Sequence, residues 1–117
     1  MSHVDNIILS FSIMEASVEN DFGPDYCVMA RINGWLLEHA SGQRFGPDLG
    51  YHFASYGGRK GLETPLYIAA FNYLPEDEFV AFLRTLPWRE PENAQLLIKR
   101  QHEDRFVVLS VGGEASA

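Results

Sequence analysis

The chain has 117 residues, of which 46% are hydrophobic and 21% charged, the size and composition of one globular domain. This apolar content excludes a largely disordered chain, and the apolar runs are far shorter than the ~20 residues that a transmembrane helix needs. The net charge of −7 disfavours nucleic acid and anionic membranes as partners, because both carry phosphate groups that repel an acidic surface.

The first predicted strand covers residues 7–13, where Ile7, Leu9 and Phe11 alternate with side chains of the opposite face. The acidic residues 15–21 follow as a loop. A helix is then expected to begin at Phe-Gly-Pro-Asp, residues 22–25, because proline is tolerated in a first helical turn and aspartate favours its positive end. The buried stripe of this helix is predicted to be Val28, Met29, Ile32, Trp35 and Leu36.

Residues 41–50 are rich in glycine and are predicted to form a loop. Phe-Gly-Pro-Asp recurs there at residues 45–48, and we expect its phenylalanine to be an apolar anchor. Strands at 51–56 and 66–73 are predicted to pair as a hairpin around the loop 57–61. That loop contains Arg59 and Lys60, a weak candidate for anion binding, although no helix follows it as a phosphate-binding loop would require.

The second helix is predicted from Pro75 to Leu86, with acidic residues 76–78 in its first turn and a proline directly after it. Its buried stripe is Phe79, Phe82, Leu83 and Leu86. Residues 87–93 form a loop, and a closing hairpin pairs residues 95–100 with residues 106–111. Residues 112–117 are small and polar, and we expect them to be a disordered tail.

These elements follow the order β-α-β-β-α-β-β. The order predicts a single α+β domain over residues 1–111. The expected architecture is ferredoxin-like, βαββαβ with an extra C-terminal strand, in which two helices cover one face of an antiparallel sheet.

The predicted strand 66–73 is apolar on both of its faces, which a sheet with one face in water would not be. One face carries Leu66, Ile68 and Ala70, and the other carries the aromatic set Tyr67, Phe71 and Tyr73. We expect the aromatic set to be covered by a second subunit, a partner protein, a ligand or the chain's own loop 41–50.

The negative charge is concentrated near the N-terminus, since residues 1–30 include no Lys or Arg. An acidic surface steers a basic protein toward it. A tryptophan-arginine pair in the loop 87–93 is a further candidate, because both residue types are enriched in binding hot spots; alternatively, the tryptophan folds back beneath the second helix. The predicted partner-binding residues are therefore Glu15, Glu19, Asp21, Asp25, Tyr67, Phe71, Tyr73, Trp88 and Arg89.

The sequence contains no pattern that indicates catalysis. The four histidines stand singly, without the ligand spacing of a zinc site. Cys27, the single cysteine, is expected to be a small buried side chain of the first helix and not a nucleophile. We therefore predict no catalytic residue, no metal site and no cofactor.

The single cysteine cannot form an internal disulfide, which is typical of a reducing compartment, and residues 1–5 lack the basic segment of a secretory signal. A cytoplasmic protein is expected. Its size, charge and composition are similar to those of bacterial toxin-immunity proteins, although no motif is shared.

Three functions are consistent with these features. The first is a small acidic protein-binding module, an inhibitor or immunity-type antagonist that docks on a basic protein. The second is a dimeric α+β barrel, an enzyme or ligand-binding protein, in which two sheets enclose a pocket. The third is a component of a structural assembly.

Overall fold

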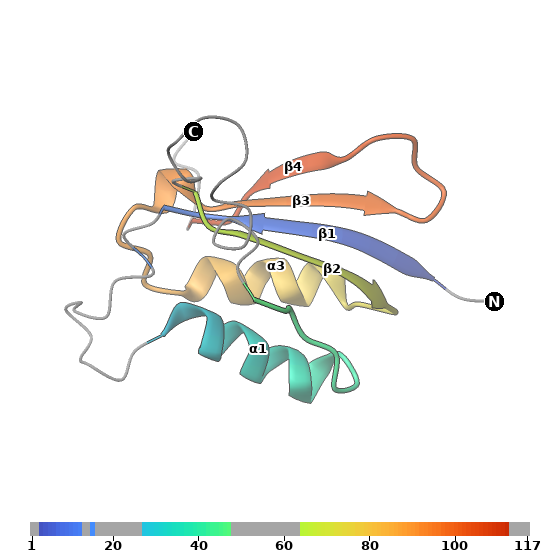
Figure 1. The fold of residues 1–117 in the computed structure, drawn as a ribbon, viewed down its shortest axis with the longest axis horizontal. Helices are drawn as coiled ribbons and strands as arrows, with labels where there is room; N and C mark the ends of the chain where they lie inside the picture. The colour runs from blue at the N-terminus through green and yellow to red at the C-terminus, as the bar shows by residue number, and fades with distance from the viewer. Residues whose placement is uncertain (1–2, 13–14, 16–26, 48–63, 113–117) are drawn as a thin grey trace.

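The computed structural model describes residues 3–12, 15, 27–47 and 64–112 (Figure 1). Its elements, in chain order, are β1 (Val4–Ser10), α1 (Val28–His39), β2 (Leu66–Asn72), α3 (Glu76–Thr85), a 3-10 turn (Pro91–Asn93), β3 (Gln95–Arg100) and β4 (Val107–Ser110). The predicted strand 51–56, the loop 57–61 and residues 113–117 of the expected tail lie outside the described residues.

The arrangement is α+β. The described strands form one four-stranded sheet in the order β2-β1-β3-β4, and each neighbouring pair is antiparallel. Strand β1 therefore lies in the interior of the sheet, between strands that come from much later in the chain. Figure 1 shows both helices on the same side of this sheet.

Both predicted helices are present, with one difference at their boundaries. Helix α1 begins at Val28, because Cys27 before it is in an extended conformation with φ −140°. The helix thus starts later than the predicted position at residues 22–25, which lie outside the described residues. Helix α3 follows Pro75 and carries its three acidic residues in the first turn, as predicted.

The hydrophobic core is one cluster that combines the sheet and both helices. The alternating residues Ile7, Leu9 and Phe11 are buried, which confirms the predicted period of two in β1. The helices contribute most of their predicted stripes to the same cluster, with Trp35 and Phe82 partly buried at its margin. The fully or nearly fully buried helix residues are Val28, Met29, Ile32, Leu36, Phe79 and Leu83.

Phe45 is the apolar anchor predicted for the loop after α1. It is buried, and its ring meets that of Phe71 edge-on at a centroid distance of 5.2 Å. Its backbone N–H donates to Oδ1 of Asn33 in α1 at 2.9 Å. The amide side chain of Gln43 pairs with the backbone of Asn72, donating at 2.9 Å and accepting at 2.7 Å. These bonds fasten the segment to both α1 and β2.

None of the helices in the part of the chain that the structure describes has the length and apolar character that crossing a bilayer requires.

Candidate functional site

The two faces of the sheet differ in what covers them. In β1, every second residue is buried toward the helices, and the residues between them are only half-buried. Strand register then assigns the side chains of the other strands to the same two faces. We call the side without helices the open face; its described residues are Val4, Asn6, Ile8, Ser10, Leu66, Ile68, Ala70, Asn72, Gln95, Leu97, Lys99, Val108 and Ser110.

Four aliphatic side chains form a continuous row across the open face, perpendicular to the strands. Ile8 of β1 is directly opposite Ile68 of β2 on one side and Leu97 of β3 on the other, and Leu97 is opposite Val108 of β4. We call these four residues the apolar row. Ile68 is 47% exposed and Val108 58% exposed, so the two ends of the row lie in solvent.

A groove of about 430 Å³ lies beside the apolar row on β1 and β2. Phe106, which directly precedes β4, contributes an exposed aromatic ring to it. The lining is almost entirely apolar and consists of Asn6, Ile7, Ile8, Ile68, Ala69, Ala70 and Phe106. The open face therefore offers a recess that an apolar side chain of a partner can enter.

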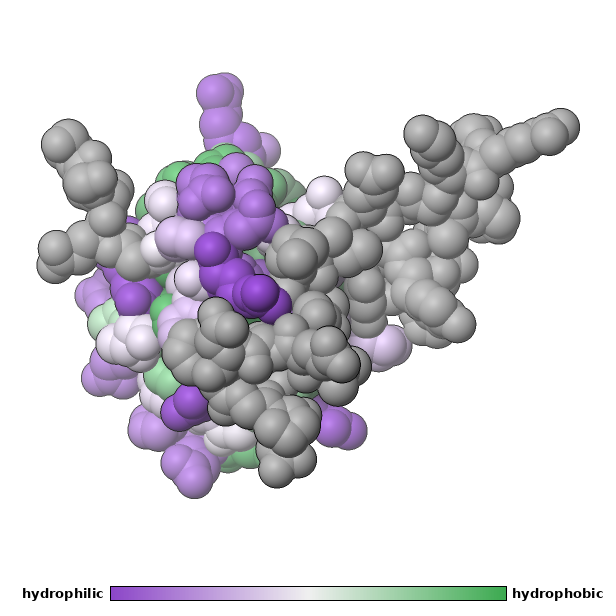
Figure 2. Space-filling view, turned by 90° about the vertical axis from the view of Figure 1, so that its left-hand side faces the viewer, coloured by the Kyte–Doolittle hydropathy of each residue, from purple (hydrophilic) through white to green (hydrophobic). Residues whose placement is uncertain are grey.

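The open face is also nearly free of charge. The chain has 16 acidic residues, yet none of the described positions of this face is acidic, and Lys99 is its one charged residue. By contrast, hydrophilic residues predominate among the residues that Figure 2 colours, with small hydrophobic areas between them. The open face thus differs in chemistry from the acidic surface that the sequence predicted as the docking site.

The aromatic set of β2 does not lie on the open face. Phe71 is opposite Asp5, and Tyr67 is opposite Leu9, both of them buried positions of β1. Phe71 is 1% exposed, and the ring of Tyr67 stacks on Phe11 at 5.7 Å. The core and Phe45 of the segment 41–47 cover Phe71, one of the alternatives that the sequence left open, so its assignment as a partner-binding residue is wrong. Tyr67 is half-buried on the same face, and its role in binding stays a prediction.

Tyr73 differs from the other two aromatic residues. It follows the end of β2 in a left-handed backbone conformation, with φ 54°, and its side chain is exposed. The ring of His3 lies 6.3 Å from its own. Tyr73 is thus at a corner of the sheet, next to the end of β1.

Glu15 is a structural carboxylate and not part of an acidic docking surface. It is 4% exposed, and its oxygens accept the backbone N–H groups of Arg89 at 3.0 Å and Glu90 at 2.8 Å. Because these bonds occupy it inside the fold, its predicted role in binding a partner is wrong. The side chain of Arg89 is exposed. The other predicted charged residues, Glu19, Asp21, Asp25, Arg59 and Lys60, lie outside the described residues.

Trp88 folds back beneath α3, which is the alternative that the sequence analysis left open for it. Its ring lies 5.5 Å from that of Phe11, and its Nε1–H donates to the backbone carbonyl of Leu83 at 2.8 Å. Burial with its one donor satisfied is the usual state of a core tryptophan. Its assignment as a binding hot spot is therefore wrong.

Cys27 is exposed at the N-terminal cap of α1, which corrects the expectation of a buried side chain. The helix starts one residue later, so the thiol lies ahead of the buried stripe. His39 is at the opposite end of the same helix, so these two residues cannot form a nucleophile–base pair.

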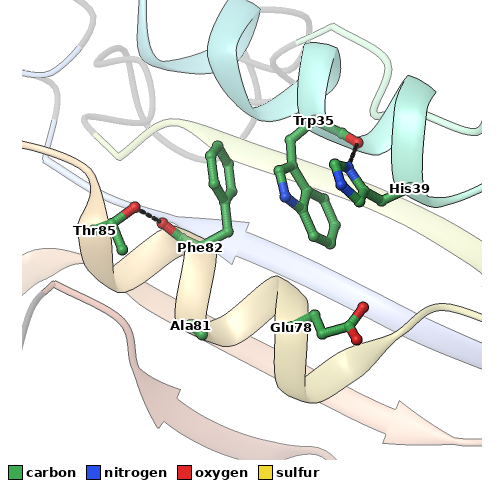
Figure 3. A pocket seen from close by; sticks show the side chains of 6 residues that line it. All are labelled: Trp35, His39, Glu78, Ala81, Phe82 and Thr85. Atoms are coloured by element: carbon green, nitrogen blue, oxygen red, sulfur yellow. Dashed lines mark hydrogen bonds between the residues drawn. The ribbon is translucent and has the colours of Figure 1, made fainter.

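A second groove, of about 560 Å³, lies between the two helices (Figure 3). Its aromatic residues contact one another: Trp35 stacks on His39 at 4.4 Å and on Phe82 at 5.2 Å. Nδ1–H of His39 also donates to the backbone carbonyl of Trp35 at 2.9 Å. Because the ring of Trp35 stacks on both His39 and Phe82, we interpret this groove as a surface of packing between α1 and α3 and not as a binding site for an aromatic ligand.

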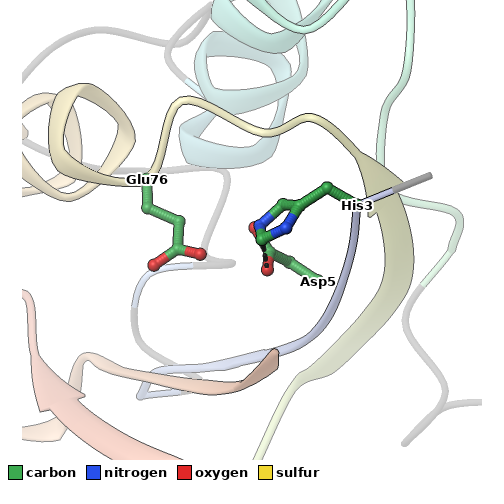
Figure 4. Close-up of side chains that lie close together, drawn as sticks. All are labelled: His3, Asp5 and Glu76. Atoms are coloured by element: carbon green, nitrogen blue, oxygen red, sulfur yellow. Dashed lines mark ion pairs between the residues drawn. The ribbon is translucent and has the colours of Figure 1, made fainter. Parts of the chain in front are cut away.

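One group of side chains among the described residues could hold a metal ion, namely His3, Asp5 and Glu76 (Figure 4). The guanidinium of Arg100 pairs with Glu76 at 2.6 Å and with Glu103 at 3.2 Å. Burial, helped by the neighbouring Glu76 carboxylate, raises the pKa of Asp5 to about 6.

The sequence patterns predicted no metal site and did not indicate this cluster. One signal was available: the period of two in β1 places Asp5 on the same buried face as Ile7 and Leu9. An acidic residue at a position reserved for the core is unusual and marks a candidate functional residue.

Comparisons with protein-family models, with curated proteins and with solved structures found no match for this chain. The function proposed below therefore rests on the geometry of the molecule itself.

Proposed function

We propose that the protein is a homodimeric interaction module whose subunits associate through the open faces of their sheets. The observation that carries this proposal is the apolar row, four aliphatic side chains in register across four strands. Contiguous apolar patches of this kind are uncommon on soluble monomers and mark association surfaces. Burying them against a second sheet contributes roughly 25 cal/mol for each Å² of apolar area.

Charge favours a second copy of this chain as the occupant. Two molecules of net charge −7 repel each other unless they meet at a surface without carboxylates, and the described open face meets that condition. A basic partner protein, the first hypothesis from the sequence, would find little electrostatic attraction on this face. A two-fold dimer also needs a self-complementary patch, and a neutral aliphatic row can pack against its own copy.

We also propose that the domain is ferredoxin-like, with β4 as the extra strand. The strand order β2-β1-β3-β4 supports this proposal, because it places β1 between strands of both halves of a split βαβ arrangement.

Light scattering coupled to size-exclusion chromatography tests the dimer. The native chain should elute at twice the mass of 13.2 kDa. Val108→Lys and Ile68→Lys should each give a monomer, because they place a charge within the apolar row. Leu37→Lys is the matched control: Leu37 is 50% exposed, but it lies on α1, away from the sheet. That variant should remain a dimer.

A native chain that is monomeric at every soluble concentration would refute the proposal. A dimer that tolerates both lysines but not Leu37→Lys would move the interface to the helices. A monomer that captures a basic protein in a salt-sensitive complex would restore the first hypothesis from the sequence.

A further inference from the structure

A polar cluster lies at the start of β1, away from the apolar row. It contains His3 just before β1, Asp5 within β1 and Glu76 at the first position of α3. One nitrogen or oxygen atom from each of these residues lies within 4.8 Å of the other two. Figure 4 shows the imidazole of His3 above the Asp5 carboxylate, with Glu76 directed toward both.

Asp5 is the unusual member of this cluster. Its side chain is 0% exposed, and as a carboxylate it has no hydrogen-bond partner for either oxygen among the described residues. Only when protonated can it share a hydrogen bond with the Glu76 carboxylate. Nε2 of His3 lies 3.3 Å from Oδ1 without completing a hydrogen bond. Buried carboxylates are normally paired or bound to a metal, because leaving one without a partner costs several kcal/mol. The ionised Asp5 carboxylate therefore lacks a partner that a bound ligand would supply.

The local charge balance indicates that this ligand is a cation. The two carboxylates of the cluster, those of Asp5 and Glu76, face one guanidinium, that of Arg100, which also pairs with Glu103. When both carboxylates are ionised, negative charge is therefore in excess beside Asp5, and a bound cation would neutralise it. Arg100 need not be displaced, because each oxygen of a carboxylate has two lone pairs and Glu76 can accept on both sides.

The donor set selects the class of cation. One imidazole nitrogen with two carboxylates suits Zn²⁺ and similar transition ions, whereas Ca²⁺ and Mg²⁺ prefer oxygen ligands throughout. Tetrahedral ligands bound to zinc at ~2.0–2.2 Å lie about 3.3–3.6 Å apart. The cluster would therefore have to contract by at most about 1.5 Å on binding, and His3, 48% exposed, has room to move.

We propose that His3, Asp5 and Glu76 form a binding site for a divalent transition-metal ion of the Zn²⁺ class. Three protein ligands leave a coordination position open to water. Arg100 is a positioning residue in this site, since it holds the Glu76 carboxylate through three contacts of 2.6 Å, 2.9 Å and 3.1 Å. The proposal is independent of the dimer, because none of these residues belongs to the open face.

Isothermal titration of the full chain with Zn²⁺, after treatment with a chelator, tests the site. We expect one ion per chain, and we expect Asp5→Asn and His3→Ala each to weaken binding by more than the about 10–100-fold typical of an outer-shell partner. Matched controls keep the residue types but lie outside the cluster: Glu78→Gln, in the same first turn of α3, and His39→Ala, at the end of α1. Both controls should bind as the native chain does.

Titration with Co²⁺ gives a second readout, because its visible absorption reports nitrogen and oxygen ligands directly. This absorption should be lost in His3→Ala and kept in His39→Ala. Thermal unfolding in chelator confirms that each variant is folded, so a loss of binding is not a loss of structure. The proposal is refuted if the native chain binds neither ion, or if Asp5→Asn binds as tightly as Glu78→Gln.

Discussion

Two carboxylates are buried in the described part of the chain, and they are held in opposite ways. Glu15 accepts two backbone N–H groups from the segment after α3, whereas Asp5 has no hydrogen-bond partner for either oxygen. The first pays for its burial with bonds inside the fold. The second, as a carboxylate, accepts no hydrogen bond and has only the His3 imidazole beside it at 3.3 Å, an arrangement that a protein tolerates where the group serves binding more than stability. The hydrogen-bond partners therefore distinguish Glu15, a structural carboxylate, from Asp5, a candidate ligand.

The largest expected effect is at Glu15. Glu15→Ala should lower the free energy of unfolding by about 3 kcal/mol, because two charge-assisted hydrogen bonds are lost and the N–H groups of Arg89 and Glu90 lose their partner. Urea denaturation at pH 7 measures this loss. Glu92→Ala, at an exposed position of the 3-10 turn, is the control and should change stability little. An equal effect of both substitutions would contradict the structural role of Glu15.

Substitution of Asp5 should change stability in the opposite direction, toward a more stable protein. In metal-free protein at pH 7, Asp5→Asn should raise the free energy of unfolding by about 1–2 kcal/mol, since it removes a buried charge that accepts no hydrogen bond. The introduced amide can also donate to the Glu76 carboxylate. Urea denaturation in the presence of a chelator measures the gain. A large loss of stability would show that the ionised carboxylate has a stabilising partner within the fold.

The difference in stability between the native protein and Asp5→Asn should depend on pH. The folded state raises the pKa of Asp5 from 3.8 to about 6, so it binds the proton more tightly than the unfolded state does. The stabilisation from protonated Asp5 is then complete below pH 3.8 and is lost as the pH rises through about 6.

Chelator-treated native protein should accordingly lose stability relative to Asp5→Asn between these pH values. Denaturation series at several pH values measure this effect. His3, Glu76, Arg100 and Glu103 are the charged or titratable groups around Asp5, so His3→Ala is a useful control for a histidine contribution. Parallel curves for native protein and Asp5→Asn would contradict the raised pKa.

Much of the local structure could be predicted from the sequence. The stripe that includes Phe79 and Leu83 and the alternation of Ile7 and Leu9 identified two helices and the first strand, because side-chain spacing is a property of the backbone geometry itself. The end of α3 could also be predicted from the nearby sequence, because Pro87 follows the helix closely. The start of α1 could not be predicted in the same way. Pro24 and Asp25 are residues typical of a helix start, but Cys27 is extended and the helix begins at Val28.

Which face of the sheet the helices cover could not be predicted. Strand β2 is apolar on both sides, so its alternation is the same whether Phe71 or Ile68 faces the core. Only the pairing of β2 with β1 decides this, because it places Phe71 opposite the buried Asp5 and Ile68 opposite Ile8. A shift of one residue would have exchanged the two faces.

Sequence patterns alone identified both helices and the strands of the described residues, together with the acidic character of the chain. The tertiary structure decided which side chains meet: Glu15 with the backbone at Arg89, and Asp5 with Glu76. These partners lie far apart in the chain, so no local pattern encodes their contact. The physical reason is that spacing along a helix or strand follows from the backbone, whereas the satisfaction of a buried charge depends on which distant segments pack around it.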